Sequence, residues 1–148
     1  GQNLGAKEYD RTKKGALFGT ICGIGIAEVI GIAVFFFSPY LIAAFGGDQK
    51  AIEYGIAEAH TIALFYCLLA FSHCMAAIQR GAGRSIVPMF VMMLVWCGVR
   101  VTYISIVIRI IPVINVIYWA YPLTWFISSV IFLILFLKTD WIHGLEKQ

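Results

Sequence analysis

The amino-acid sequence predicts an all-α integral membrane protein with four transmembrane helices. Hydrophobic residues make up 61% of its 148 positions and charged residues only 13%, so the chain has too little polar surface to cover a water-soluble globule. Its mean hydropathy of +0.86 agrees with lipid as the solvent. The apolar runs are long enough for helices to cross a hydrocarbon core, which takes about 20 residues, whereas strands of that length are exceptional.

Polar and proline-containing segments separate the four apolar runs. Ser38–Pro39 is expected to end the first helix, Asp48 to cap the N-terminus of the second, and Pro112 to end the third. Pro122, within the last run, removes one backbone hydrogen bond and is expected to kink that helix. The predicted order is a cytoplasmic loop (1–14), a transmembrane helix (15–37), an outer loop and helix start (38–60), a transmembrane helix (61–79), a cytoplasmic turn (80–85), a transmembrane helix (86–110), an outer loop (111–115), a transmembrane helix (116–137) and a cytoplasmic tail (138–148).

Positive charges are distributed unevenly between the two sides of this arrangement. Cytoplasmic loops of membrane proteins are enriched in Lys and Arg, so the side with more of them is predicted to be cytoplasmic. The sequence therefore predicts a multi-pass protein of the cell (plasma) membrane with both ends of the chain in the cytoplasm. The cytoplasmic side carries Lys7, Arg11, Lys13, Lys14, Arg80, Arg84, Lys138 and Lys147, and the outer side carries Lys50 and Arg109.

Two short motifs on the predicted cytoplasmic side resemble a known transporter family. Gly1–Ala6 (GQNLGA) followed by Arg11–Gly15 (RTKKG) is similar to the loop before the ninth helix of the multidrug and toxic compound extrusion (MATE) transporters. Gln79–Ser85 (QRGAGRS), leading into Pro88, resembles the turn between the tenth and eleventh helices of that family. The two motifs stand at the right separation, and the resemblance extends over essentially the whole chain.

This resemblance implies a parent protein of twelve helices in two six-helix lobes, of which the chain is part of the C-terminal lobe, helices nine to twelve. The absence of an initiator methionine fits such an excised segment. The implied function is multidrug efflux by antiport, the export of cationic or amphipathic drugs in exchange for H⁺ or Na⁺. The expected partners are the lipid bilayer, the remainder of the parent transporter, those drugs and the coupling ion. The sodium-coupled branch has an aspartate in its tenth helix, but this chain has no acid between Thr61 and Gln79. The alternative to coupling through that aspartate is coupling through a carboxylate of the missing N-terminal lobe.

Glu28 and Arg100 are candidate residues of a substrate or ion pathway. Each lies about 13 or 14 residues past the cytoplasmic start of its helix, which at ~1.5 Å per residue places both about 20 Å deep. A charge at mid-membrane costs roughly 2.5 to 3.5 kcal/mol on insertion scales, which favours pairing of the two side chains. Such a pair would lock two helices together, whereas an unpaired Glu28 could bind protons in a cation pathway. Alternatively, Glu28 faces the missing lobe, and Arg100 faces neighbouring aromatic rings or a backbone carbonyl.

Three further candidates are aromatic. Trp96 and Tyr103 share a helical face with Arg100 and could form an aromatic wall for flat cationic drugs, or simply belong to the bundle core. Trp96 and Arg100 also follow the Gln79–Ser85 motif at the spacing seen in the MATE family. His73 could relay protons, or be a neutral histidine that is hydrogen-bonded to a neighbouring helix.

Small residues recur at every fourth position along the first predicted helix. In lipid, where helices gain no hydrophobic drive toward one another, such a stripe permits the close approach that van der Waals packing needs. It could also be a sliding surface during transport. The stripe consists of Gly15, Gly19, Gly23, Ala27 and Gly31.

The remaining motifs argue against other functions. No catalytic motif is present, so the chain is not expected to be an enzyme or to use a cofactor, and its cysteines lack metal-ligand spacing. The cations alternate with apolar runs and form no groove-sized basic face, which excludes nucleic acid as a partner. Two alternatives to drug export stay open, a flippase of lipid-linked saccharides with a related fold and a free-standing four-helix membrane module.

Overall fold

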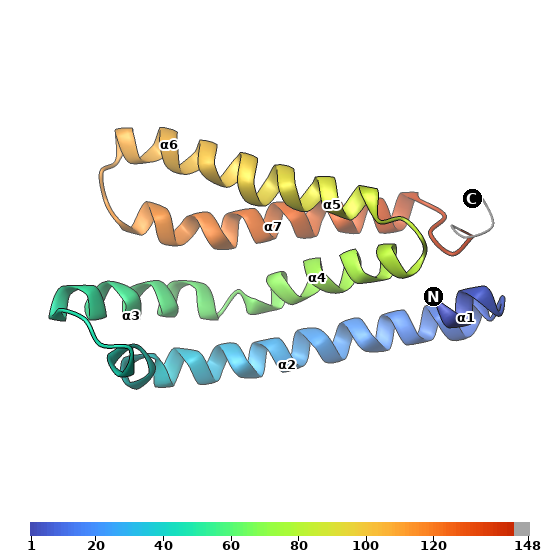
Figure 1. Ribbon diagram of the computed structural model, residues 1–148, viewed down its shortest axis with the longest axis horizontal. Helices are drawn as coiled ribbons and strands as arrows, with labels where there is room; N and C mark the ends of the chain where they lie inside the picture. Colours follow the sequence, from blue (N-terminus) through green and yellow to red (C-terminus); the bar gives the residue numbers. More distant parts are fainter. Residues whose placement is uncertain (144–148) are drawn as a thin grey trace.

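The structure is a computed structural model that describes residues 1–143, and within that range all secondary structure is helical (Figure 1). Three helical segments are long and apolar enough to cross a membrane, and a bent pair of shorter helices makes a fourth. The prediction of an all-α membrane fold is thereby confirmed. The elements are α1 (Gln2–Gly5), α2 (Tyr9–Ala44), α3 (Gln49–Ala63), α4 (Tyr66–Gly81), α5 (Ile86–Met92), a π-helical segment η1 (Met93–Val99), α6 (Arg100–Ile110) and α7 (Asn115–Lys138).

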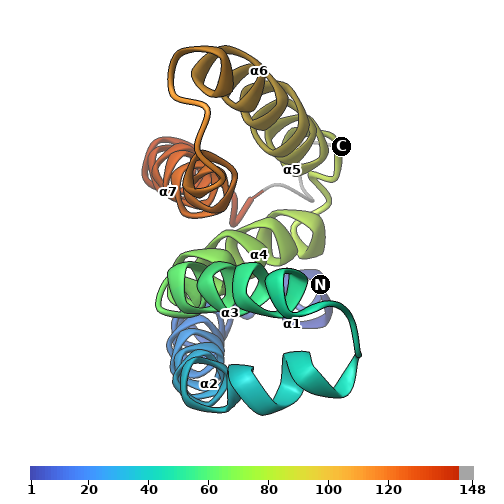
Figure 2. The ribbon, with the colours of Figure 1, turned by 90° about the vertical axis from the view of Figure 1, so that its left-hand side faces the viewer.

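The helices form a row in which the last one is inserted between earlier ones. The α3–α4 pair packs along α2, and α7 packs on α4 with one side and on the α5–α6 segment with the other (Figures 1 and 2). The N-terminus and the end of α7 lie at the same end of the bundle (Figure 1). This arrangement places α7, the most buried of the apolar helices, at the centre of the site described below.

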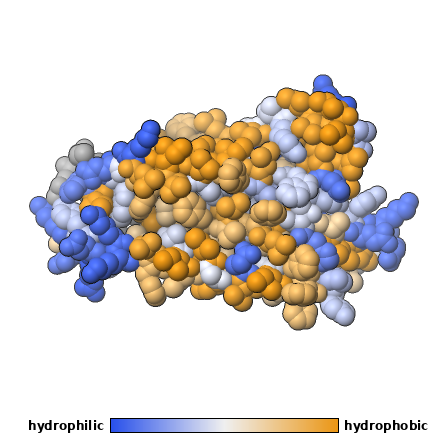
Figure 3. Space-filling view, turned by 180° about the vertical axis from the view of Figure 1, so that it is seen from behind, coloured by the Kyte–Doolittle hydropathy of each residue, from blue (hydrophilic) through white to orange (hydrophobic). Residues whose placement is uncertain are grey.

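The outer surface is apolar and the interior holds many polar residues. On the face drawn in Figure 3, apolar side chains cover much of the middle, and hydrophilic side chains gather at the two ends. Large apolar side chains such as Phe18, Phe36 and Leu137 are each more than half exposed. Thr124 and Ser128, in contrast, are fully buried between helices. Apolar residues outside and hydroxyls inside are the distribution expected where lipid is the solvent.

Helix α2 does not end at Ser38–Pro39, so that prediction was wrong. The helix continues through Pro39 to Ala44, and its last turns bend away from the rest of the helix (Figure 2). The hydroxyl of buried Ser38 donates a hydrogen bond to the carbonyl of Phe35, which helps to satisfy the backbone around the proline. At the other end the helix starts at Tyr9, inside the expected loop. Its 36 residues span about 54 Å, well beyond a hydrocarbon core of about 30 Å.

The second predicted helix is broken, which the sequence did not indicate. It forms α3 and α4, which meet at Leu64–Phe65 with a bend of 59°. The expected N-cap of α3 is confirmed, because the Asp48 carboxylate accepts a hydrogen bond from the backbone N–H of Ala51 at 2.7 Å. Neither glycine nor proline stands at the break. At the break both helix ends contact α2, the start of α4 at Glu28 and the end of α3 at Gly31.

The last two helical segments each contain a proline, but at different positions. Pro88 lies in the first turn of α5, where its missing N–H leaves no hydrogen bond unmade. Pro122 lies inside α7, which runs as one helix from Asn115 to Lys138. The part of the predicted tail beyond residue 143 lies outside the described residues. Which residues of each helix lie within the hydrocarbon stays a prediction.

Candidate functional site

Arg100 lies at the centre of a polar and aromatic cluster between α4, α6 and α7. Its Nε and Nη2 atoms donate hydrogen bonds to Oγ1 of Thr124, at 3.3 and 2.7 Å. The guanidinium carbon lies 4.3 Å from the ring centroid of Tyr121 and 5.9 Å from that of Trp96. Among the described residues no carboxylate pairs with it. A guanidinium stacked on aromatic faces keeps part of its electrostatic stabilisation without a counter-ion.

Thr124 can accept these hydrogen bonds because its own proton is used elsewhere. The fully buried hydroxyl donates to the backbone carbonyl of Ala120 at 2.9 Å, one turn earlier in α7. Its lone pairs are therefore available to Arg100. Helix α7 positions Tyr121 and Thr124 on the same side, since residues three apart are neighbours on a helix surface.

A chain of hydroxyl groups continues from this cluster into the interface between α4 and α7. The indole N–H of Trp96 donates to the hydroxyl of Ser128 at 3.2 Å. The hydroxyl of Ser72 lies 2.9 Å from that of Ser128 and 3.0 Å from that of Ser129. The hydroxyl of Ser129 donates to the backbone carbonyl of Leu68. Hydrogen-bonded polar side chains are a main source of cohesion between helices in lipid.

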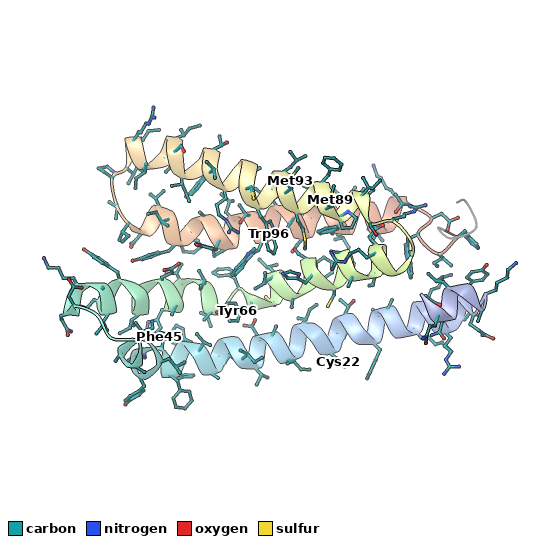
Figure 4. The ribbon with its side chains drawn as sticks, viewed as in Figure 1. Cys22, Phe45, Tyr66, Met89, Met93 and Trp96 are labelled. Atoms are coloured by element: carbon teal, nitrogen blue, oxygen red, sulfur yellow. The ribbon has the colours of Figure 1, made fainter. Side chains whose placement is uncertain are left out.

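The structure brings His73 and Trp96 into contact, whereas Tyr103 lies apart from them. The His73 ring meets Trp96 edge to face, with centroids 5.2 Å apart. Trp96 lies between α4 and α7, and Tyr66 lies beside the break at the start of α4 (Figure 4). Tyr103 instead borders an open surface depression together with Gly98 and Val99. The spacing that links Trp96, Arg100 and Tyr103 within one helix therefore did not determine which of them contacts α7.

Glu28 and Arg100 do not pair, so the favoured form of that hypothesis was wrong. The Glu28 carboxylate accepts a hydrogen bond from the backbone N–H of Cys67 at 3.2 Å, at the start of α4. Arg100 faces Thr124 and aromatic rings, so only the part of the alternative that concerns Arg100 and Trp96 is confirmed. The predicted equal depth in the membrane did not imply contact, because α4 and α7 stand between the two helices (Figure 1).

Sequence reasoning missed the contribution of α7. Tyr121, Thr124 and Ser128 follow one another at spacings of three and four residues, which places them on one helical face. This polar stripe inside an apolar run was a readable signal. Its partner could not be read, because the choice of α4 and α6 as neighbours depends on the tertiary arrangement.

Buried hydroxyls and a guanidinium without a carboxylate partner among the described residues, enclosed by long apolar helices, define the chain as part of a multi-pass membrane protein. The family model MatE matches residues 1–104, from α1 to within α6. The chain belongs to the MatE family, whose members are membrane efflux transporters and not enzymes. Comparisons with curated proteins and with solved structures gave no match. The matched range includes Glu28, His73, Trp96, Arg100 and Tyr103.

Proposed function

We propose that this chain supplies four membrane-spanning segments of the C-terminal lobe of a plasma-membrane antiporter. The parent protein exports cationic or amphipathic compounds in exchange for H⁺ or Na⁺. The MatE match carries the proposal, because it covers the helices that contain the intramembrane charges and most of the aromatic cluster. Within it, we assign contact with the exported compound to the Arg100 cluster, defined as His73, Trp96, Arg100, Tyr121 and Thr124.

The composition of the Arg100 cluster supports this role. Trp96 and Tyr121 present large flat faces, which bind planar amphipathic compounds by stacking. His73 is exposed at the edge of the cluster and can offer or accept a hydrogen bond there. Arg100 fixes the two rings, so the surface is preorganised.

The export role predicts that the aromatic face of Trp96 matters more than its indole N–H. In proteoliposomes of the full-length protein, with an imposed pH or Na⁺ gradient, Trp96→Ala is expected to lower the export of a fluorescent planar cation about fivefold to tenfold. Loss of about 1 to 1.4 kcal/mol of aromatic contact corresponds to such a change. Trp96→Phe, which keeps a ring, is expected to retain most of the activity.

Trp119→Ala is the matched control for this experiment. Trp119 is 52% exposed on α7 and contacts Phe65, away from Arg100, so its removal is expected to leave export within twofold of the wild type. Equal losses for Trp96→Ala and Trp119→Ala would remove the cluster from the pathway. No export under either gradient would contradict the antiport function itself.

The proposed orientation places both ends of the chain in the cytoplasm. The structure supports it only in part, because the N-terminus and the end of α7 lie at one end of the bundle (Figure 1). With a cysteine-free background in intact cells, Gly83→Cys is expected to resist a membrane-impermeant thiol reagent, whereas Pro112→Cys is expected to react. The reverse pattern would invert the orientation. Gly83 and Pro112 lie in connections at opposite ends of the α5–α6 segment.

A further inference from the structure

At the break between α3 and α4, one backbone N–H donates its hydrogen bond to a side chain of another helix instead of to a carbonyl of its own span. In a continuous helix the N–H of Cys67 would donate to the carbonyl of Ala63, four residues earlier. Here it donates to Oε2 of Glu28 on α2, at 3.2 Å. A carboxylate at this position compensates the positive end of the α4 dipole and satisfies one of its free N–H groups. A charged Glu28 therefore stabilises the broken form of the span.

The other side of the break also rests on α2. A Cβ atom at Gly31 would lie 2.3 Å from the carbonyl oxygen of Ala63, so only glycine lets this helix end approach so closely. Gly31 lies three residues after Glu28, on the same face of α2. One turn of α2 thus binds the N–H of Cys67 and lies against the C=O of Ala63, the two groups that would bond to each other in a straight span.

Glu28 is the only residue with a charged side chain between Lys14 and Ala44 of the sequence. A carboxylate that is held at a helix N-terminus by its charge can be neutralised by one proton. Once it is neutral, it loses its charge-dependent preference for the N-terminus of α4. The titratable groups that face this part of α2 are Tyr66, Cys67 and Cys74 from α4 and His60 from α3, which stacks on Phe35.

We propose that Glu28 is a proton-binding site that sets the bend between α3 and α4. With Glu28 ionised, its carboxylate binds the N–H of Cys67 and the span is broken. When one proton binds, that N–H returns to the carbonyl of Ala63 and the span straightens, and release of the same proton restores the bend. As a coupling step for antiport this rests on the proposed function, but the site and the bend do not require it. Helix ends at such breaks are places where transporters bind their ions.

The bend is measured by distances between spin labels at positions 50 and 80, at the two ends of the broken span. Both native residues, Lys50 and Arg80, are exposed, and the native cysteines are replaced by alanine in the full-length protein. Removing a bend of 59° is expected to lengthen the separation by about 6 Å, given 1.5 Å per residue in each helix. We expect this lengthening on acidification of the wild type. Glu28→Gln is expected to show the longer distance at every pH.

His60→Gln is the matched control. It removes the titratable side chain of α3 that stacks on Phe35 of α2 and leaves Glu28 in place. It is expected to keep the pH-dependent lengthening. A distance that does not change with pH in His60→Gln would overturn the proposal, even if Glu28→Gln fails to fold. A pH dependence that persists in Glu28→Gln would overturn it as well. The measurement needs no substrate, so a pH-dependent bend in a protein that does not export would contradict the proposed function and leave the proton site intact.

Discussion

Replacing Gly31 by alanine is expected to lower the free energy of unfolding by about 3 kcal/mol, at the upper end of the usual range for overpacking. The added methyl group would lie 2.3 Å from the carbonyl oxygen and 3.2 Å from the carbonyl carbon of Ala63. Both are backbone atoms, so no side chain can rotate away and a whole helix end must move. Chemical unfolding of the purified protein in mixed micelles measures the change.

Gly19→Ala provides a control on the same stripe of small residues. Gly19 borders a space next to Cys74 and Ala77 of α4, and a Cβ atom there would meet nothing within 4 Å. Because alanine is also favoured over glycine in helices, this change is expected to be neutral or slightly stabilising. Equal losses at Gly19 and Gly31 would show that the stripe, and not the contact with Ala63, controls stability.

The small-residue stripe shows where sequence reasoning reached its limit. The spacing indicates a face for close packing, but not which positions are in contact. In the structure, Gly31 meets a backbone carbonyl and a Cβ atom at Gly23 would lie 2.9 Å from the Cys74 sulfur, whereas Gly15 and Gly19 have free space. The difference arises from the course of α3 and α4 along α2, which no pattern within α2 records.

The helical fold was readable because each apolar run is long and lipid permits few alternatives. Asp48 was readable as a helix cap because its hydrogen bond to Ala51 is local. The prediction that Pro39 ends its helix was wrong because membrane helices tolerate proline more readily than water-soluble helices do. The break at Leu64–Phe65 has no local sequence signal. The N–H of Cys67 at the break donates to Glu28, which lies 39 positions away in the sequence.

The candidate site was readable only as a set of residue types. Trp96 and Arg100 were selected from one helix, and the structure places both in the Arg100 cluster. Tyr103 was selected by the same spacing and borders an open depression instead, because spacing within one helix does not record which neighbouring helix a side chain contacts. Thr124 makes the hydrogen bonds on which Arg100 depends, but its role follows from the insertion of α7 between α4 and α6.

The dependence of Arg100 on Thr124 predicts a strong energetic coupling. Thr124→Val is expected to lower the free energy of unfolding by about 2 kcal/mol, because the guanidinium loses both hydrogen bonds while it remains charged. In an Arg100→Met background the same change is expected to cost about 0.5 kcal/mol, since no charge is then left without its acceptor. The coupling energy of the cycle is therefore expected to be about 1.5 kcal/mol.

A second cycle, between Glu28→Gln and Arg100→Gln, is the control for this coupling. The two side chains bind different partners, Cys67 and Thr124, so their effects are expected to add within about 0.5 kcal/mol. The same unfolding measurement serves both cycles. Two results together would contradict this prediction. They are coupling in the Glu28–Arg100 cycle and a cost of Thr124→Val that is the same in the Arg100→Met background, and they would indicate an ion pair between Glu28 and Arg100. Coupling in the Arg100–Thr124 cycle alone would show that a hydroxyl, held by α7, takes the place of a counter-ion within the membrane.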